Sequence, residues 1–265
     1  MTIGLSIVTP TLNAARWLPA CLANVAEQGY ESVEHIIVDG GSRDATLELA
    51  QTVSGVLVLD RPGTNQAQAI NEGFRAARGD VLAWLNADDE YTPDTLRLVA
   101  QHFAARPELD ALYGDCDVID SGTRLLWRER PGPYDFQRLL RSGNYLAQPA
   151  VFVHRRVFER SGYLDESFEC GMDLELWLRL KDCHVEYVPR VLARYRWYAS
   201  SKTAINQFGC WRELLRLVRR HGGGWTPQLA WKFARMLLTL VRERAQLALK
   251  GAPTREWLRV PRLDS

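Results

Sequence analysis

The 265-residue chain lacks the cysteine patterns of metal and disulfide folds, and it lacks the long apolar runs of membrane proteins. Its five cysteines form no CxxC pair and no zinc-ligand spacing, and their odd number predicts no disulfide framework. No stretch reaches the roughly 18 uncharged apolar residues that a membrane span needs. Residues 1–5 lack the basic and apolar regions of a signal peptide. These absences favour a protein of the reducing cytoplasm.

Several catalytic signatures are missing as well. The segment His221-Gly222-Gly223-Gly224 could suggest a hydrolase, but the sequence contains no G-x-S-x-G elbow to provide the nucleophile. It contains neither a P-loop nor an HExxH zinc motif. No recognised nucleic-acid-binding module accompanies its basic residues. Hydrolase, P-loop and nucleic-acid-binding functions are therefore not predicted.

The overall composition is that of an ordinary globular protein, but the charge is unevenly distributed. The chain is 46% hydrophobic and 25% charged, and it is long enough for one large domain with an appendage. Residues 205–265 contain 12 Lys and Arg against 4 Asp and Glu, a net charge of +8, whereas residues 1–204 carry −7. Such asymmetry often marks a segment that faces an anionic partner. We therefore divide the chain into a domain at 1–204 and a basic region at 205–265.

The first ninety residues alternate between strand and helix patterns. Apolar runs predict strands at 5–9, 35–38, 56–59 and 81–85, and helical periodicity predicts helices at 16–28, 44–52 and 67–77. Such alternation predicts a mostly parallel sheet covered by helices on both faces.

Beyond this region the pattern is less regular. We expect a helix at 92–105, with Thr92 as its N-cap and Pro93 in its first position. Further patterns predict strands at 111–113, 148–153, 185–188 and 192–196, helices at 155–161 and 169–181, and a hairpin turn at 120–122. The charged, Pro- and Gly-containing stretch at 128–133 is expected to be a loop facing the substrate.

The basic region at 205–265 is predicted to be helical. We expect helices at 210–220 and 227–250, separated by a hinge at 222–224. The longest charge-free run of the second helix is 236–241, which is too short to span a bilayer. A basic amphipathic helix with tryptophan can lie on an anionic membrane surface. The alternative is that it packs on the domain or on a second copy of the chain.

The strand at 81–85 runs directly into the cluster Asn86, Asp88, Asp89 and Glu90. Open α/β sheets bind their ligands at the carboxyl ends of strands. Hard oxygen donors suit Mg²⁺ or Mn²⁺, which then bridge to substrate phosphates. The alternative is an acidic turn that caps the next helix.

Four motifs, taken together and in this order, resemble the family 2 glycosyltransferases, which are inverting enzymes of the GT-A fold. They are Val8-Thr9-Pro10-Thr11-Leu12-Asn13, Ile37-Val38-Asp39-Gly40-Gly41-Ser42-Arg43-Asp44-Ala45-Thr46, Leu85-Asn86-Ala87-Asp88-Asp89 and Met172-Asp173-Leu174-Glu175-Leu176-Trp177-Leu178-Arg179. The resemblance covers about residues 5–200. It implies an α/β fold with a Rossmann-like, mostly parallel mixed sheet flanked by helices, followed by the C-terminal helical appendage. It also implies transfer of a sugar from a nucleotide-diphosphate donor, expected to be a UDP-sugar, to a hydroxyl of a glycan or lipid-linked acceptor.

On the donor side, the resemblance implies that Asp39 accepts a hydrogen bond from a pyrimidine N–H. Without its neighbours, Asp39 would equally fit a turn-forming residue before glycine. The remaining donor-side candidates line the base and ribose pocket or lie in the family's donor-side helix: Thr9, Pro10, Thr11, Gln68 and Asn71.

Asn86, Ala87 and Asp88 resemble the family's DxD motif, with Asn in its first position. This departure removes one charge, so the cation is expected on Asp88, with Asn86 or Asp89 contributing directly or through water. The cofactor implied is Mn²⁺ or Mg²⁺, which would stabilise the departing diphosphate.

On the acceptor side, Asp173 resembles the general base that takes the acceptor hydroxyl proton. The Glu that usually precedes it is Met172 here, and a role as helix cap is the alternative for Asp173. Gln148 and Met172 are further acceptor-side candidates. Relatives often carry a histidine near Arg196, at the position of Tyr198.

Two other functions compete with this interpretation. A nucleotidyltransferase would bring a glycine-rich basic loop near the N-terminus, where residues 9–18 offer only Arg16. A non-catalytic sugar- or nucleotide-binding protein would explain Asn86 and Met172 as lost chemistry, but the retained Asp39, Asp88, Asp89 and Asp173 argue against it. We predict a metal-dependent inverting glycosyltransferase in polysaccharide or lipid-linked glycan assembly, peripheral on the inner face of the cytoplasmic membrane.

Overall fold

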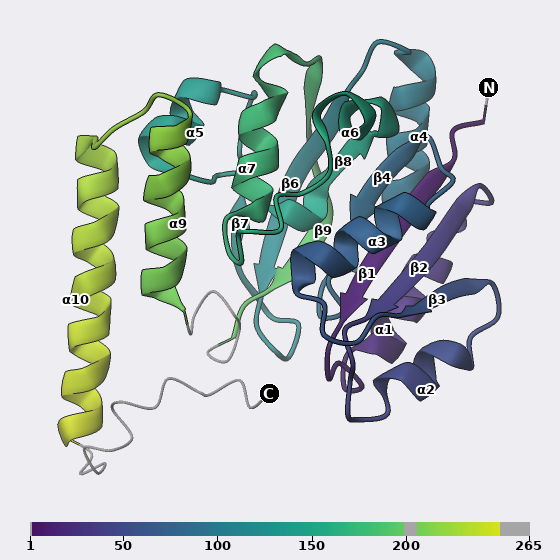
Figure 1. Cartoon of the computed structure of the whole chain (residues 1–265), viewed down its shortest axis with the longest axis horizontal. Helices are drawn as coiled ribbons and strands as arrows, with labels where there is room; N and C mark the ends of the chain where they lie inside the picture. The colour runs from purple at the N-terminus through teal and green to yellow at the C-terminus, as the bar shows by residue number, and fades with distance from the viewer. Residues whose placement is uncertain (1, 199–205, 250–265) are drawn as a thin grey trace.

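A nine-stranded mixed sheet forms the centre of the protein, whose computed structural model describes residues 2–198 and 206–249 (Figure 1). The strand order is β3-β2-β1-β4-β8-β6-β9-β5, and β7 pairs with β6. The strands are β1 (Leu5–Thr11), β2 (Val33–Asp39), β3 (Val56–Asp60), β4 (Val81–Trp84), β5 (Glu90–Tyr91), β6 (Ala111–Ile119), β7 (Leu125–Glu129), β8 (Val151–His154) and β9 (Val185–Arg196).

The first half of the sheet is the parallel α/β unit that the sequence predicts. Strands β3, β2, β1 and β4 are parallel to one another, and α1 (Leu18–Ala26), α2 (Thr46–Gln51) and α3 (Gln66–Ala76) connect them. The two faces are covered by different helices, because α3 packs on Val8 and Val38 whereas α1 packs on Leu5 and Ile7. A side chain at Gly73 of α3 would collide with Val8, so this glycine lets the helix lie close to the sheet. The predicted GT-A architecture, a mixed sheet between helices, is confirmed.

The second half of the sheet brings a distant strand to the end of β4. Strand β8 is antiparallel to both β4 and β6, and β9 is parallel to β6. The two strands predicted at 185–188 and 192–196 are one strand, β9, whose last residues pair with β5. Glu90 lies opposite Arg194 and Tyr91 opposite Ala193. The acidic segment after β4 is therefore held by a strand about a hundred residues further along the chain.

Two predicted boundaries are wrong for identifiable reasons. Helix α4 (Thr95–Ala105) starts after the predicted cap, because the Thr92 hydroxyl donates to the Val191 carbonyl (2.6 Å) instead of capping the helix. Asp94 is the N-cap, with a left-handed φ of 63°. Residues 148–150 are a 3₁₀ turn, η1 (Gln148–Ala150), rather than the start of a strand, since Pro149 cannot donate to a ladder.

Besides the two-residue strand β5, two elements are additional to the predicted ones: β7 and α5. The first of them, the edge strand β7, forms a hairpin with β6 around the predicted turn at Asp120. Its last residues, 128–129, overlap the stretch at 128–133 that was predicted as a loop. Helix α5 (Phe136–Ser142) follows, and the Asp135 side chain accepts a hydrogen bond from the Arg138 N–H at its start (3.0 Å). Both are short, so sequence periodicity over them is weak.

The remaining helices cover one face of the second half-sheet and extend beyond it (Figure 1). They are α6 (Arg155–Ser161), α7 (Met172–Arg179), η2 (Leu180–Asp182), α9 (Gln207–Arg220) and α10 (Pro227–Leu249). Helix α9 contacts α7, and α10 contacts α5. Trp211, Trp225 and Phe233 join α9 to α10, with ring centroids 5.0–6.2 Å apart. Across residues 2–198 and 206–249, no helix is both long enough and apolar enough to cross a membrane.

A disulfide between Cys170 and Cys210 links α9 to the loop before α7. The expectation that the cysteines form no disulfide is therefore wrong for this pair. The two residues lie 40 positions apart and meet because α9 docks on α7, which cysteine spacing does not reveal. Cys21 and Cys116 are free and buried, and Cys183 is free and partly buried.

Candidate active site

The acidic segment lies at the carboxyl end of β4, and Asp89 is its internal member. Asp89 is only 1% exposed. The Arg196 backbone N–H donates to its Oδ1 (2.9 Å), and the Asn86 Nδ2 donates to its Oδ2 (3.1 Å). Burial, and then the neighbouring Asp88 charge, raise the pKa of Asp89 well above its ordinary value. Both Asp89 oxygens are thus committed to holding the loop.

Arg196 organises the rest of this segment from the end of β9. Its buried guanidinium donates to the Asp88 carbonyl (2.9 Å), to Glu90 Oε1 (2.6 Å) and to the Asp120 carbonyl (3.0 Å). The Trp17 ring covers it, with 4.9 Å between the guanidinium carbon and the ring centroid. Sequence reasoning gave Arg196 no role, since an arginine at a strand end carries no specific signal. It fixes the backbone from which Asp88 projects.

Among the described residues, Asp88 is the carboxylate of this segment that keeps one oxygen without a hydrogen bond. The Tyr198 hydroxyl donates to its Oδ2 (2.8 Å), and burial together with this bond raises the pKa of Tyr198. Within the described part of the chain, Oδ1 of Asp88 accepts no hydrogen bond. Among those same residues, no three His, Cys, Asp or Glu side chains converge as a ready metal centre. The donor set fits a cation held by one carboxylate and by substrate phosphate oxygens, as is common for Mg²⁺.

Asn86 is fixed by neighbours on both sides. Gln66, the first residue of α3, donates from Nε2 to its Oδ1 (2.9 Å). Asn86 Nδ2 also faces Gln148 Oε1 (3.3 Å), and Gln148 Nε2 donates to the Trp84 carbonyl (2.6 Å). Gln148, predicted on the acceptor side, therefore also contacts the DxD-like segment. The sequence analysis did not single out Gln66, because this residue belongs to none of the recognised motifs.

Asp39 is buried at the end of β2 and organises the turn that follows it. The backbone N–H groups of Gly41 and Ser42 donate to its Oδ1 (3.0 and 2.7 Å). The hydroxyls of Thr11 and Ser42 donate to its Oδ2 (2.9 and 2.6 Å). Asp39 can form this turn and still accept a hydrogen bond from a nucleotide base. The Thr11 or Ser42 hydroxyl can rotate away and leave a lone pair of the Asp39 carboxylate free.

The other donor-side candidates diverge in their orientation. The Thr9 hydroxyl lies in the interior, 2.9 Å from His35 Nε2, where burial lowers the pKa of His35 to about 4. Gln68 forms a capping box with Asn65 at the start of α3 (both bonds 2.9 Å). Asn71 bonds the Leu164 backbone and ties α3 to the chain before α7. Of the predicted pocket, Pro10 is partly exposed and Thr11 contacts Asp39.

Asp173 lies in the first turn of α7, half-buried. Asn144 Nδ2 donates to its Oδ2 and the Leu174 N–H donates to its Oδ1, both at 2.7 Å. Removal from water raises the pKa of Asp173 to about 6, and these two bonds limit the rise. Gly171, not Asp173, is the N-cap of the helix. Asn144 was not singled out by sequence, because it belongs to a separate loop.

Helix α7 packs directly on the strand that carries the acidic segment. Trp177, one turn after Asp173 on the same face, stacks on Trp84 with ring centroids 5.9 Å apart and an interplanar angle of 15°. Trp84 precedes Asn86 by two residues. Met172, the other acceptor-side candidate, is buried in the core. One packed unit thus joins the carboxylate of Asp88 to the helix of Asp173.

Comparison with known proteins agrees with this architecture. The family model described as Glycosyl transferase family 2 matches residues 6–164. A PGL/p-HBAD biosynthesis glycosyltransferase of Mycobacterium bovis is 39% identical over 163 residues, which cover 59% of this chain and 61% of the relative. The O-antigen biosynthesis protein RfbC of Myxococcus xanthus is 36% identical over 189 residues, 67% of this chain and 14% of that protein. The chain thus spans about three fifths of the mycobacterial relative's length.

Two solved structures share the fold at low sequence identity. S. aureus TarS 1–349 in complex with UDP is 15% identical, with a TM-score of 0.64 over 83% of this chain and 65% of that chain. The mannosyltransferase PcManGT from Pyrobaculum calidifontis, in complex with GDP-Man and Mn²⁺, is 18% identical, with a TM-score of 0.62 over 98% of this chain and 82% of that chain.

Proposed function

Because the chain belongs to glycosyl transferase family 2, we propose that it transfers a sugar from a nucleotide-diphosphate donor to an acceptor hydroxyl with inversion at the anomeric carbon. One observation carries the proposal. A carboxylate whose pKa is raised to about 6 stands on a helix that is stacked against the strand carrying Asp88. This combination offers a base for an acceptor and an anchor for a diphosphate within one packed unit.

Asp173 is the base in this mechanism. The acceptor oxygen forms a bond to the anomeric carbon while the bond from that carbon to the diphosphate oxygen breaks. The hydroxyl proton passes to the Asp173 carboxylate, and the electron pair of the broken bond leaves with the diphosphate. A pKa of about 6 keeps Asp173 ionised at neutral pH and makes it more basic than an exposed carboxylate. Attack opposite the departing diphosphate inverts the configuration.

Asp88 is the residue that would hold a divalent cation, with Mn²⁺ or Mg²⁺ as the candidates. When bound, such an ion neutralises charge on the departing diphosphate. Asp89 and Asn86 serve as the support of Asp88, since the Asp89 oxygens bond Arg196 and Asn86, and the Asn86 oxygen accepts from Gln66. The PcManGT structure, which contains both GDP-Man and Mn²⁺, supports the presence of a cation beside the donor.

A UDP-sugar is the proposed donor. Asp39 can accept from a pyrimidine N–H once the Thr11 or Ser42 hydroxyl rotates away. The TarS structure in complex with UDP supports a pyrimidine nucleotide. The proposed acceptor is a hydroxyl of a polysaccharide or lipid-linked glycan, in keeping with the O-antigen biosynthesis role in the name of the Myxococcus relative.

Calorimetric titration with UDP-, GDP- and dTDP-sugars, each with and without Mn²⁺, tests the donor assignment. We expect a UDP-sugar to bind most tightly and Mn²⁺ to strengthen its binding by about tenfold or more, equal to about 1.4 kcal/mol. UMP is the matched control, because without a diphosphate it should show little Mn²⁺ effect. If no donor binds under either condition, the transferase proposal is contradicted and a function without nucleotide sugars must be sought.

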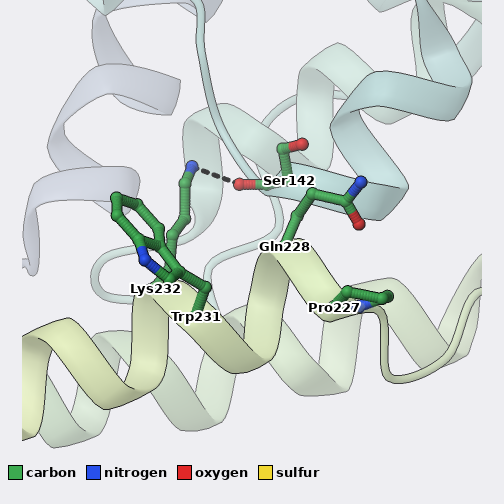
Figure 2. Close-up of a pocket in the computed structure, with 5 residues that line it drawn as sticks. All are labelled: Ser142, Pro227, Gln228, Trp231 and Lys232. Atoms are coloured by element: carbon green, nitrogen blue, oxygen red, sulfur yellow. Dashed lines mark hydrogen bonds between the residues drawn. The ribbon is translucent and has the colours of Figure 1, made fainter.

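We also propose that α10 lies on an anionic lipid surface. Its exposed side chains include Trp231 (60%) and Leu238 (58%), and Arg235 sits over the Trp231 ring at 5.0 Å. Trp231 and Lys232 both line a cavity of about 380 Å³ between α5 and α10, where Lys232 donates to the Ser142 carbonyl (Figure 2). Residues 207–249 contain eight Lys and Arg against two Asp and Glu, which complements anionic headgroups.

Vesicle flotation tests this surface. The full chain should float with vesicles containing phosphatidylglycerol and remain behind with neutral phosphatidylcholine vesicles, and added salt should weaken the binding. Trp231→Ala should reduce partitioning by about tenfold, from lost apolar burial. Trp127→Ala is the control, since Trp127 is similarly exposed but lies on β7. Equal flotation with both vesicle types would contradict the proposal, and concentration-dependent dimers without flotation would assign the face to a second copy.

A further inference from the structure

One face of α9 is attached, turn by turn, to the segment that precedes α7. Four positions at helical spacing make these contacts: Cys210 is bonded to Cys170, Glu213 accepts from the backbone at 169–171, Leu217 lies against Gly171, and Arg220 donates to Asp165 Oδ2 (2.8 Å). Figure 1 shows α9 between α7 and α10. The residue that follows this segment by two positions is Asp173.

Glu213 makes the most specific of these contacts. Its Oε1 accepts from the Glu169 N–H (3.0 Å), and its Oε2 accepts from the N–H groups of Cys170 (2.8 Å) and Gly171 (2.9 Å). The N-cap Gly171 has no side chain to hold the start of α7. The Glu213 carboxylate instead holds the backbone immediately before the helix, and a negative charge there is favourable to the helix dipole.

The approach of α9 requires a glycine at position 171. A Cβ added there would lie 2.9 Å from Leu217 Cδ1, closer than such atoms approach. Glu213 can reach the backbone of the loop because the two chains are this close. Any displacement of α9 therefore displaces the first turn of α7.

Helix α9 also touches the loop that carries Asn144. Leu214, next to Glu213, packs against Gly143, where an added Cβ would lie 3.1 Å from Leu214 Cδ1. Gly143 has a φ of +73° and directly precedes Asn144, which donates to Asp173. The same helix thus contacts both chain segments that meet in the Asn144–Asp173 hydrogen bond.

We propose that Glu213 is a positioning residue for the catalytic base, acting through the 169–171 backbone to hold Asp173 against Asn144. The inference rests on the proposed function, in which Asp173 is the base. The C-terminal region is then part of the catalytic machinery through α9, in addition to any membrane contact through α10. Neither the family motifs nor the family match, which ends at residue 164, includes this helix.

Glu213 also affects the base electrostatically. Its charge adds to the desolvation that raises the pKa of Asp173. The other charged groups of α9 on this side have partners of their own: Arg216 lies over the Phe168 ring (4.9 Å) and Arg220 bonds Asp165. On α7, Glu175 bonds Arg179 (3.0 Å). Removal of the Glu213 charge should therefore lower the pKa of Asp173.

The test is Glu213→Gln in the full chain. We expect kcat to fall about ten- to a hundredfold from displacement of the base, with the donor Kd unchanged. The acidic limb of the kcat/KM profile should move to lower pH, and the amides of residues 169–171 should exchange hydrogen faster. Glu213→Asp keeps the negative charge but has a shorter side chain. It should therefore lower kcat less than Glu213→Gln does, and it should leave the acidic limb of the kcat/KM profile at its wild-type pH. Arg212→Gln, on the exposed side of α9, is the control and should behave as wild type.

The outcomes separate this inference from the proposed function. If Asp173→Asn abolishes transfer while Glu213→Gln keeps the wild-type kcat and acidic limb, the positioning role is overturned and the base assignment stands. If Asp173→Asn retains transfer, both are overturned. Should Glu213→Gln not fold, an unchanged kcat in Glu213→Asp would overturn the positioning role.

Discussion

Replacing Asp173 with asparagine is expected to lower kcat by about 10²- to 10⁴-fold while leaving donor affinity within about twofold of wild type. The substitution preserves the volume of the side chain and one acceptor oxygen, which can keep the hydrogen bond from either Asn144 or the Leu174 N–H, since these two groups donate to different oxygens of Asp173. It removes the basic lone pair that would take the acceptor proton. Donor contacts should survive, because Asp173 is on α7 whereas Asp88 follows β4 and Asp39 is the last residue of β2.

Steady-state rates over a range of pH test this expectation. Protonation of Asp173 removes the base, so the wild-type kcat/KM should fall as pH drops below about 6, the value to which burial raises its pKa. Asn144→Ala deletes a hydrogen bond that lowers this pKa, so it should move the acidic limb to higher pH. Asp182→Asn is the matched control, since Asp182 follows α7 and its side chain is 85% exposed. Turnover above about a tenth of wild type in Asp173→Asn would remove Asp173 from the role of base.

The parallel half of the sheet could be predicted from sequence because its signals are local. Apolar runs near Val8, Val38 and Leu82 alternate with helical periods, and the residues of these three runs are buried on both faces of their strands. The same local logic placed the acidic segment at the end of β4. The second half depends on pairings between distant residues, such as Glu90 with Arg194, which no local pattern specifies. This is why β7 and α5 were missed and β9 was predicted as two strands.

The roles of Asp88 and Asp89 illustrate the same limit within the site. In sequence they are adjacent carboxylates, and only the resemblance to the DxD motif favours Asp88 over Asp89 as the cation ligand. The register of β9 places the Arg196 N–H against Asp89 and the Tyr198 hydroxyl against Asp88. One carboxylate becomes an internal support and the other keeps an oxygen for a ligand. A long-range pairing thus decides which of them can serve as a ligand.

On the donor side, the sequence indicated candidate residues but not the directions of their side chains. Side chains alternate along β1, so Thr9 and Thr11 share a face, yet only Thr11 reaches Asp39 at the strand end. For Gln68 a readable signal existed: Asn65 followed three residues later by Gln is the capping-box pattern at a helix start. Applying it would have assigned Gln68 to the helix and drawn attention to Gln66 instead.

Replacing Asp88 with asparagine is expected to weaken donor binding in Mn²⁺ at least tenfold, a loss of about 1.4 kcal/mol. Binding without a cation should change little. We expect kcat to fall by about 10²- to 10³-fold, since stabilisation of a leaving diphosphate is worth several kcal/mol. Calorimetric titration of the UDP-sugar with and without Mn²⁺ measures the effect independently of turnover. Asp94→Asn is the control, because its side chain is 71% exposed in the same loop.

The Asp89→Asn variant tests whether Asp89 binds the cation itself or only holds the loop that carries Asp88. Asparagine can still accept from the Arg196 N–H, but its amide group cannot accept from Asn86 as the carboxylate Oδ2 does. We therefore expect a lower melting temperature in Asp89→Asn and a retained Mn²⁺ effect on donor binding, the reverse of Asp88→Asn. If Asp88→Asn keeps the Mn²⁺ effect and Asp89→Asn loses it, the assignment must be exchanged, and the loop held by Arg196 would have to open before a donor binds.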